Sequence, residues 1–139
     1  MSASWKARVS RLVRAVAVAR AWYDLVADSH PDLSRARLAA LRERELGCAL
    51  VHVRRLDGGV RVLTPVGVAL LVPRLAGLRL GSWLVERELH DALRRAHRRC
   101  TDDQRSELEI ATRYIGLFRS SPGPACVPMG AMQRSERLR

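Results

Sequence analysis

The stretch VHVRRLDGGVRVLTPVG, residues 51–67, most constrains the fold because its periodicity changes twice. Apolar and polar residues alternate on both sides of the Asp-Gly-Gly segment at 57–59. Alternation that flanks a glycine-rich turn is typical of a two-stranded hairpin. Thr64 and Pro65 then supply an N-cap oxygen and a preset backbone angle for a following helix. The pattern predicts a β-hairpin over residues 51–63 in an otherwise helical chain.

Helical periodicity dominates the rest of the chain. Apolar residues from Trp5 to Val26 follow in steps of four and three, which indicates either one helix buried on one side or two helices that break near Arg20. Asp32 is expected to cap a second helix, Leu33 to Leu46, which stops at Gly47. A further helix is predicted to start at Thr64 and to be kinked or divided by Pro73, Gly77 and Gly81. Another is predicted from Trp83 to about Arg99, with Ser82 as its N-cap. The last is predicted from Thr101 to about Phe118, with a capping box formed by Thr101 and Gln104.

The length and composition indicate one compact domain. The chain has 139 residues, of which 47% are hydrophobic, enough for one core but not two. We expect a folded domain over residues 1–119 and a flexible basic tail over 120–139. The three cysteines are widely spaced, which argues against a disulfide scaffold and a structural zinc site. Without a signal peptide or a long apolar segment, the chain is predicted to be cytoplasmic, with no membrane partner.

The charge of the chain points to a polyanionic partner. The formal net charge is +11, and all but Lys6 of the 25 basic residues are arginines. The planar guanidinium fork suits phosphates and guanine edges, and a strongly positive field favours nucleic acid or an anionic membrane surface. A GC-rich coding bias would explain arginine in place of lysine, but not the excess over 14 acidic residues. Nucleic acid is the favoured partner on this evidence.

The order of the predicted elements resembles a winged helix-turn-helix. The Glu-Leu-Gly at 45–47, followed by a wing and the Thr64-Pro65 helix start, is similar to the LysR type of bacterial regulator. The Leu-Thr-Pro-Val-Gly at 63–67 before a long helix, and a later helix that opens with Thr-Asp-Asp-Gln at 101–104, looks like the MarR type. The resemblance implies a mainly α fold with one β-hairpin, a winged helix with additional C-terminal dimerisation helices, and a homodimeric, sequence-specific regulator of transcription that binds double-stranded DNA.

The resemblance also assigns roles to individual residues. It places helix 33–46 in the major groove and the hairpin at 51–63 on the DNA as the wing. Leu38 and Leu41 would then pack inward, leaving readout to residues near the helix start while other arginines meet phosphates. The predicted DNA-binding residues are Ser34, Arg35, Arg37, Arg42, Arg44, Arg54, Arg55 and Arg61. The competing interpretation of the helix is a solvated charged surface whose arginines pair with Glu43 and Glu45.

The sequence predicts no enzyme. It shows no Ser-His-Asp arrangement and no glycine-rich loop suited to nucleotide phosphates. His97 and Cys100 are spaced like half of a metal site, but no second pair accompanies them, so no metal or other cofactor is expected. The alternative function is a non-enzymatic helical adaptor or assembly protein that binds an acidic protein partner. RNA binding is a third option, weakened by the few aromatic residues available for stacking.

Overall fold

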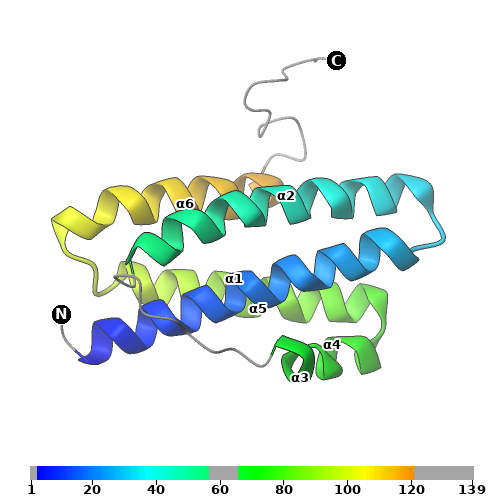
Figure 1. The fold of residues 1–139 in the computed structure, drawn as a ribbon, viewed down its shortest axis with the longest axis horizontal. Coiled ribbons are helices and arrows are strands. Elements are labelled where there is room, and N and C mark those ends of the chain that lie inside the picture. Colours follow the sequence, from blue (N-terminus) through cyan, green and yellow to red (C-terminus); the bar gives the residue numbers. More distant parts are fainter. Residues whose placement is uncertain (1–2, 57–65, 121–139) are drawn as a thin grey trace, which may run out of the picture.

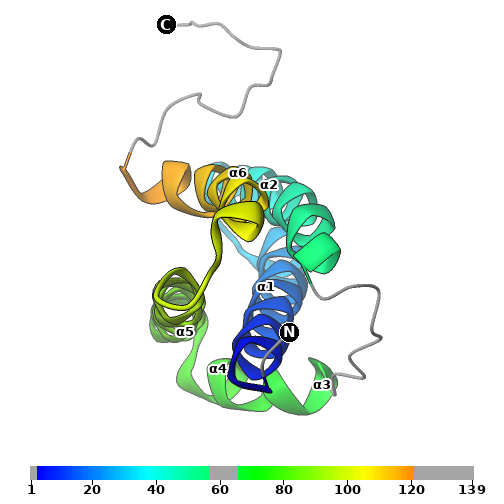
Figure 2. The ribbon, with the colours of Figure 1, turned by 90° about the vertical axis from the view of Figure 1, so that its left-hand side faces the viewer.

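A computed structural model describes residues 3–56 and 66–120, all of which form helices or the turns between them (Figure 1). The helices are α1 (Ala3–Ser29), α2 (Leu33–Leu56), α3 (Val66–Ala69), α4 (Leu71–Ala76), α5 (Leu78–His97) and α6 (Asp102–Ser120). The four long helices form a bundle in which each runs antiparallel to the helices it packs against. The end-on view places α2 and α6 on one side and the short helices α3 and α4 on the opposite side (Figure 2).

Helix α1 is the central element of the bundle. It packs against both α2 and α5, and α6 lies along α2. The apolar stripe that begins at Trp5 and ends at Val26 is buried, so the predicted helical face is confirmed. The helix is continuous through Arg20, which settles the choice between one helix and two. Two neighbours on different sides explain why α1 is apolar on more than one face.

The predicted β-hairpin and winged-helix fold are wrong, because the described residues contain no strand. Residues 51–56, expected to be the first strand, form the last turns of α2. Val53 and Leu56 continue the buried stripe of Leu46 and Ala49 at helical spacing. Burial against α1 and α6 therefore outweighs a short alternation of apolar and polar residues. The proposed turn and second strand, residues 57–63, lie outside the described residues.

Gly47 does not end α2, as the sequence had suggested, but lies within it. A Cβ at this position would lie 3.3 Å from the guanidinium carbon of Arg20. The same guanidinium donates from Nε to Glu43 at 2.8 Å. The missing side chain thus makes room for an ion pair between α1 and α2, which offsets part of the roughly 1 kcal/mol that glycine costs in a helix.

Of the three residues expected to kink or divide the chain before α5, Gly77 separates two helices, whereas Pro73 lies within α4 and Gly81 within α5. Gly77 separates α4 from α5 with φ +95°, a left-handed conformation that glycine adopts without strain. However, α5 begins at Leu78 rather than behind Ser82. The Ser82 hydroxyl lies inside α5, where it donates to the carbonyl of Leu78 at 2.8 Å and accepts from Trp22 Nε1 at 2.9 Å. The proposed Thr64-Pro65 helix start lies outside the described residues.

Two predicted helix starts are borne out by their hydrogen bonds. The Asp32 carboxylate accepts from the amides of Ser34 at 2.9 Å and Arg35 at 3.3 Å. Gln104 Oε1 accepts from the Thr101 amide at 3.0 Å, which is the glutamine half of the predicted capping box. None of the described helices is long and apolar enough to cross a membrane. The proposed tail beyond Ser120 lies outside the described part of the chain.

A substitution at Gly81 tests the packing of α5 on α1 and α4. A Cβ there would lie 2.5 Å from the Pro73 carbonyl and 2.7 Å from the Trp22 ring. We expect Gly81→Ala to lower the free energy of unfolding by about 1–3 kcal/mol, because the backbone must move. The matched control is Gly116→Ala in α6, where a Cβ meets nothing within 4 Å and helix propensity favours alanine. Urea unfolding compares the two, and equal stability of both variants would contradict this packing.

Candidate functional site

The centre of the bundle contains a buried ion pair between α2 and α5. Arg42 Nε donates to Glu86 Oε2 at 3.0 Å and Nη2 donates to Oε1 at 2.8 Å, a bidentate pair. The Arg42 side chain is 0% exposed. Glu45, one turn along α2, lies 3.7 Å from Arg42 Nη1. The predicted DNA contact at Arg42 is therefore wrong for this structure, since its guanidinium is enclosed.

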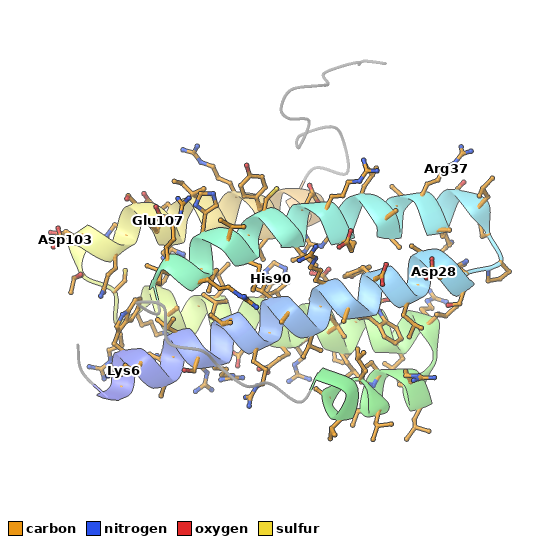
Figure 3. The ribbon with its side chains drawn as sticks, in the orientation of Figure 1. Lys6, Asp28, Arg37, His90, Asp103 and Glu107 are labelled. Atoms are coloured by element: carbon orange, nitrogen blue, oxygen red, sulfur yellow. The ribbon has the colours of Figure 1, made fainter. Side chains whose placement is uncertain are left out.

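All four long helices contribute to this cluster. The Tyr23 hydroxyl of α1 donates to Glu86 Oε2 at 2.6 Å. Arg42 Nη1 donates to the Tyr114 carbonyl of α6 at 3.2 Å. His90 Nε2 lies 3.3 Å from Glu86 Oε1 (Figure 3). We call Tyr23, Arg42, Glu45, Glu86 and His90 the central cluster.

The electrostatics of the central cluster fix the protonation states of Glu86 and Tyr23. Burial would raise the pKa of Glu86, but the His90 ring nitrogen 3.3 Å away, the hydrogen bonds and charge of Arg42 and the Tyr23 hydroxyl together lower it to about 2. Burial raises the pKa of Tyr23, and the adjacent Glu86 carboxylate raises it further. Glu86 is thus a carboxylate and Tyr23 a neutral phenol near neutral pH. A carboxylate held so strongly by a guanidinium is a poor general base, and its contacts, with those of Arg42, join all four long helices.

The histidines considered for a metal site make other contacts. His97 Nε2 lies 2.9 Å from Thr112 Oγ1, whose hydroxyl donates to the Leu108 carbonyl at 2.6 Å. The threonine oxygen therefore accepts from His97, and burial lowers the pKa of that histidine. The Cys100 thiol donates to the His97 carbonyl at 3.4 Å. Within residues 3–56 and 66–120, no three His, Cys, Asp or Glu side chains are grouped as a metal site requires.

The other predicted DNA-binding residues that the structure describes lie at exposed positions of α2. Arg37, Arg44 and Arg54 have no carboxylate within ion-pair distance among the described residues. Arg35 lies 3.9 Å from Asp32 and Arg55 lies 3.5 Å from Glu107. Exposed Ser34 lies in the first turn, and Arg61 lies outside the described residues. Figure 3 shows Arg37 pointing away from the bundle.

The expected inward packing of Leu38 and Leu41 is wrong. These side chains are 46% and 53% exposed, respectively, and the buried face of α2 instead carries Ala39 and Arg42. We define the outer face of α2 by its exposed residues at steps of four and three, which are Arg37, Leu41, Arg44, Cys48, Val51 and Arg55. In the competing interpretation, the arginines of this helix pair with Glu43 and Glu45 at the surface. The structure differs, because Glu43 binds Arg20 of α1 and Glu45 is buried.

Sequence reasoning missed the central cluster. The separation of Glu86 and His90 by four residues on a predicted helix was the available local signal. The partners Tyr23 and Arg42 come from distant parts of the chain, so no spacing in the sequence indicates them. Comparison with protein-family models, with curated proteins and with solved structures finds no match.

Replacing Arg42 tests whether the cluster is structural. We expect Arg42→Met to lower the free energy of unfolding by about 3–5 kcal/mol, because Glu86 is left buried without its guanidinium. Arg44→Met, two residues along the same helix but exposed, should change stability by less than about 0.5 kcal/mol. The double variant Arg42→Met, Glu86→Met should lose less than the sum of the two single losses. Additive losses in urea unfolding would contradict the pairing.

The cluster also predicts acid sensitivity. The pKa of Glu86 is lowered from 4.5 to about 2 in the folded chain, so its contribution is complete above the unfolded value and is lost as pH falls toward 2. That contribution is roughly 3 kcal/mol, at 1.36 kcal/mol for each pKa unit. Urea unfolding between pH 6 and 2 should show a steeper decline for the native chain than for Glu86→Gln. Parallel declines would remove Glu86 as the source.

Proposed function

We propose that the chain is a non-enzymatic protein that binds the phosphate backbone of double-stranded DNA through the outer face of α2. The observation that carries the proposal is the row of exposed arginines on this helix without carboxylate partners among the described residues, in a chain of net charge +11. Arginines that no acid neutralises are available to phosphates and release counterions when they bind.

The spacing of these arginines supports contact with a duplex. At 1.5 Å per residue, Arg37 and Arg44 of the outer face are about 10 Å apart along the helix axis, and Arg54, which is exposed beside that face, is about 15 Å further. The three cations thus extend over a length comparable with the phosphates that border one groove. Leu41, Cys48 and Val51 lie between them, so the outer face offers few donors to base edges. The proposal therefore covers backbone binding and not sequence readout, because a wing and an exposed Arg42 are both missing from the described structure.

A second candidate function is the binding of an acidic protein helix. The exposed apolar side chains Leu41 and Val51 between the arginines favour it, since an amphipathic acidic helix would match both kinds of side chain. A polyanion without duplex geometry separates the two functions. Binding of random duplex DNA and of polyglutamate is compared at equal phosphate and carboxylate concentrations. Tighter binding of the duplex supports the DNA function. Equal or weaker binding of the duplex supports the acidic-helix function.

Removal of the unpaired arginines tests the DNA proposal. In the variant Arg37→Gln, Arg44→Gln, Arg54→Gln, we expect weaker binding to random duplex DNA and a salt dependence shallower by roughly one log unit per log unit for each arginine. The control variant Arg14→Gln, Arg74→Gln, Arg79→Gln removes the same charge from exposed positions elsewhere and should retain most of both. Fluorescence anisotropy at several salt concentrations measures each slope. Equal losses in the two variants would show that net charge alone is responsible.

The exposed thiol of Cys48 gives an independent readout. Cys48 lies on the outer face of α2, whereas Cys100 is only partly exposed. With Cys100 and Cys126 replaced by serine, duplex DNA should slow maleimide modification of Cys48 if it covers this face. An unchanged modification rate at saturating DNA would place the contact elsewhere.

A further inference from the structure

A second exposed surface lies on α3 and α4, on the side of the bundle away from α2 (Figures 1 and 2). Four large apolar residues recur there at helical spacing, and we call them the α3–α4 apolar face: Val68, Leu71, Val72 and Leu75. All four are exposed, and Leu75 is 87% exposed. Several side chains of these short helices project away from the bundle (Figure 3), although Pro73 of α4 is buried. Ordinary soluble surfaces rarely gather so many large apolar side chains in one place.

The start of α5 extends this surface around the Gly77 corner. A shallow hollow there is bordered by Ala76, Gly77, Leu78, Arg79, Leu80 and Trp83. Leu80 is 51% exposed and Trp83 is 53% exposed. The guanidinium of Arg87 lies over the Trp83 ring, 5.3 Å from its centre. Tryptophan and arginine side chains of this amphipathic kind are favoured where an apolar phase meets water.

The charge around the surface identifies what can cover it. Residues 66–85 contain Arg74 and Arg79 and no Asp or Glu, and both arginines are exposed. A cavity beside Ala69 and Pro73 is also bordered by exposed Arg14 of α1 and by Glu88 of α5, whose carboxylate binds Arg11. A two-fold contact with a second copy would bring Arg74 and Arg79 against their own equivalents, with no acid in residues 66–85 to separate them. Charge complementarity therefore favours an anionic partner over a second copy.

We propose that the α3–α4 apolar face, with Leu80 and Trp83, inserts into the surface of an anionic lipid bilayer. A protruding apolar surface needs no matching shape in a fluid interface, whereas a rigid protein partner would have to supply a concave site. The apolar side chains enter the boundary between headgroups and acyl chains, and the arginines contact lipid phosphates. This inference is independent of the proposed DNA contact, because it uses other residues on another side, and it replaces the sequence-based expectation of no membrane partner.

Vesicle binding of the full chain tests the inference. We expect the protein to float with phosphatidylglycerol–phosphatidylcholine vesicles and not with phosphatidylcholine alone, since both charge and apolar insertion are required. Val72→Asp, Leu75→Asp should weaken binding roughly tenfold or more, because two inserted side chains become charged. The matched control Leu38→Asp, Leu41→Asp introduces the same charges on exposed leucines of α2 and should retain binding. Circular dichroism checks that both variants stay helical.

Tryptophan fluorescence reports the insertion directly. Trp5 and Trp22 are buried, so Trp83 is the tryptophan whose surroundings a bilayer changes. A blue shift on addition of anionic vesicles, absent in Trp83→Phe, supports insertion. Equal weakening in the two double variants, or vesicle binding without any shift, would overturn the inference in favour of electrostatic adsorption. Self-association that Val72→Asp, Leu75→Asp abolishes, without vesicle binding by the native chain, would overturn it in favour of a second copy.

Discussion

The ion pair between Arg42 and Glu86 joins two helices that lie diagonally across the bundle and do not pack directly on each other. The arginine side chain reaches from α2 to Glu86 of α5, and its Nη1 also donates to the Tyr114 carbonyl of α6. Its charge is stable there because every strong hydrogen-bonding group of Glu86 and Arg42 finds a partner from the surrounding helices. Removing water from such a pair costs free energy that offsets much of the attraction between the two charges. The pair therefore indicates that the relative position of α2 and α5 is specified, and it does not by itself indicate high stability.

This arrangement explains which parts of the fold the sequence predicted. The stripes of α1 and α5 were readable because apolar residues recur at helical spacing in both, as Val85, Leu89, Ala92 and Ala96 do in α5. The capping carboxylate of Asp32 and the side chain of Gln104 were readable because they act within one helical turn. The turn at Gly77 was predictable because glycine adopts positive φ angles, such as the +95° found here, without strain.

The errors have a common physical origin in α2. Its inward face carries Arg42 between Ala39 and Leu46. The assumption that charged side chains face solvent therefore assigns the wrong buried face to α2 and places Leu38 and Leu41 in the core. Gly47 resembled a helix end because its actual role, room for Arg20, involves a residue of another helix. The alternation at 51–56 resembled a strand, but Val53 and Leu56 are buried where α2 packs against other helices, and this packing is visible only in the tertiary structure. Of the arginines of α2 predicted to contact DNA, Arg42 is buried and the other five are exposed. The sequence reading of residues 66–76 predicted helix but not an exposed apolar face.

The bundle therefore presents two chemically different sides. The outer face of α2 mixes scattered apolar side chains with arginines, of which Arg37 and Arg44 have no carboxylate partner among the described residues. The α3–α4 apolar face instead concentrates large apolar side chains with arginines around them. Both proposals follow from this separation, and the central cluster lies between the two sides without reaching either. Substitutions on one side should leave the other unchanged, because distant sites without shared partners act independently.

The four helices that meet at the central cluster also bear on how the chain folds. Tyr23 and Arg42 belong to the first half of the sequence, and Glu86 and Tyr114 belong to the second. A hairpin of α1 and α2 alone would leave a guanidinium facing apolar surface without its carboxylate, and a hairpin of α5 and α6 alone would leave the opposite charge in the same position. Because neither half alone contains both Arg42 and Glu86, this pairing favours a single cooperative transition in which the two halves fold together.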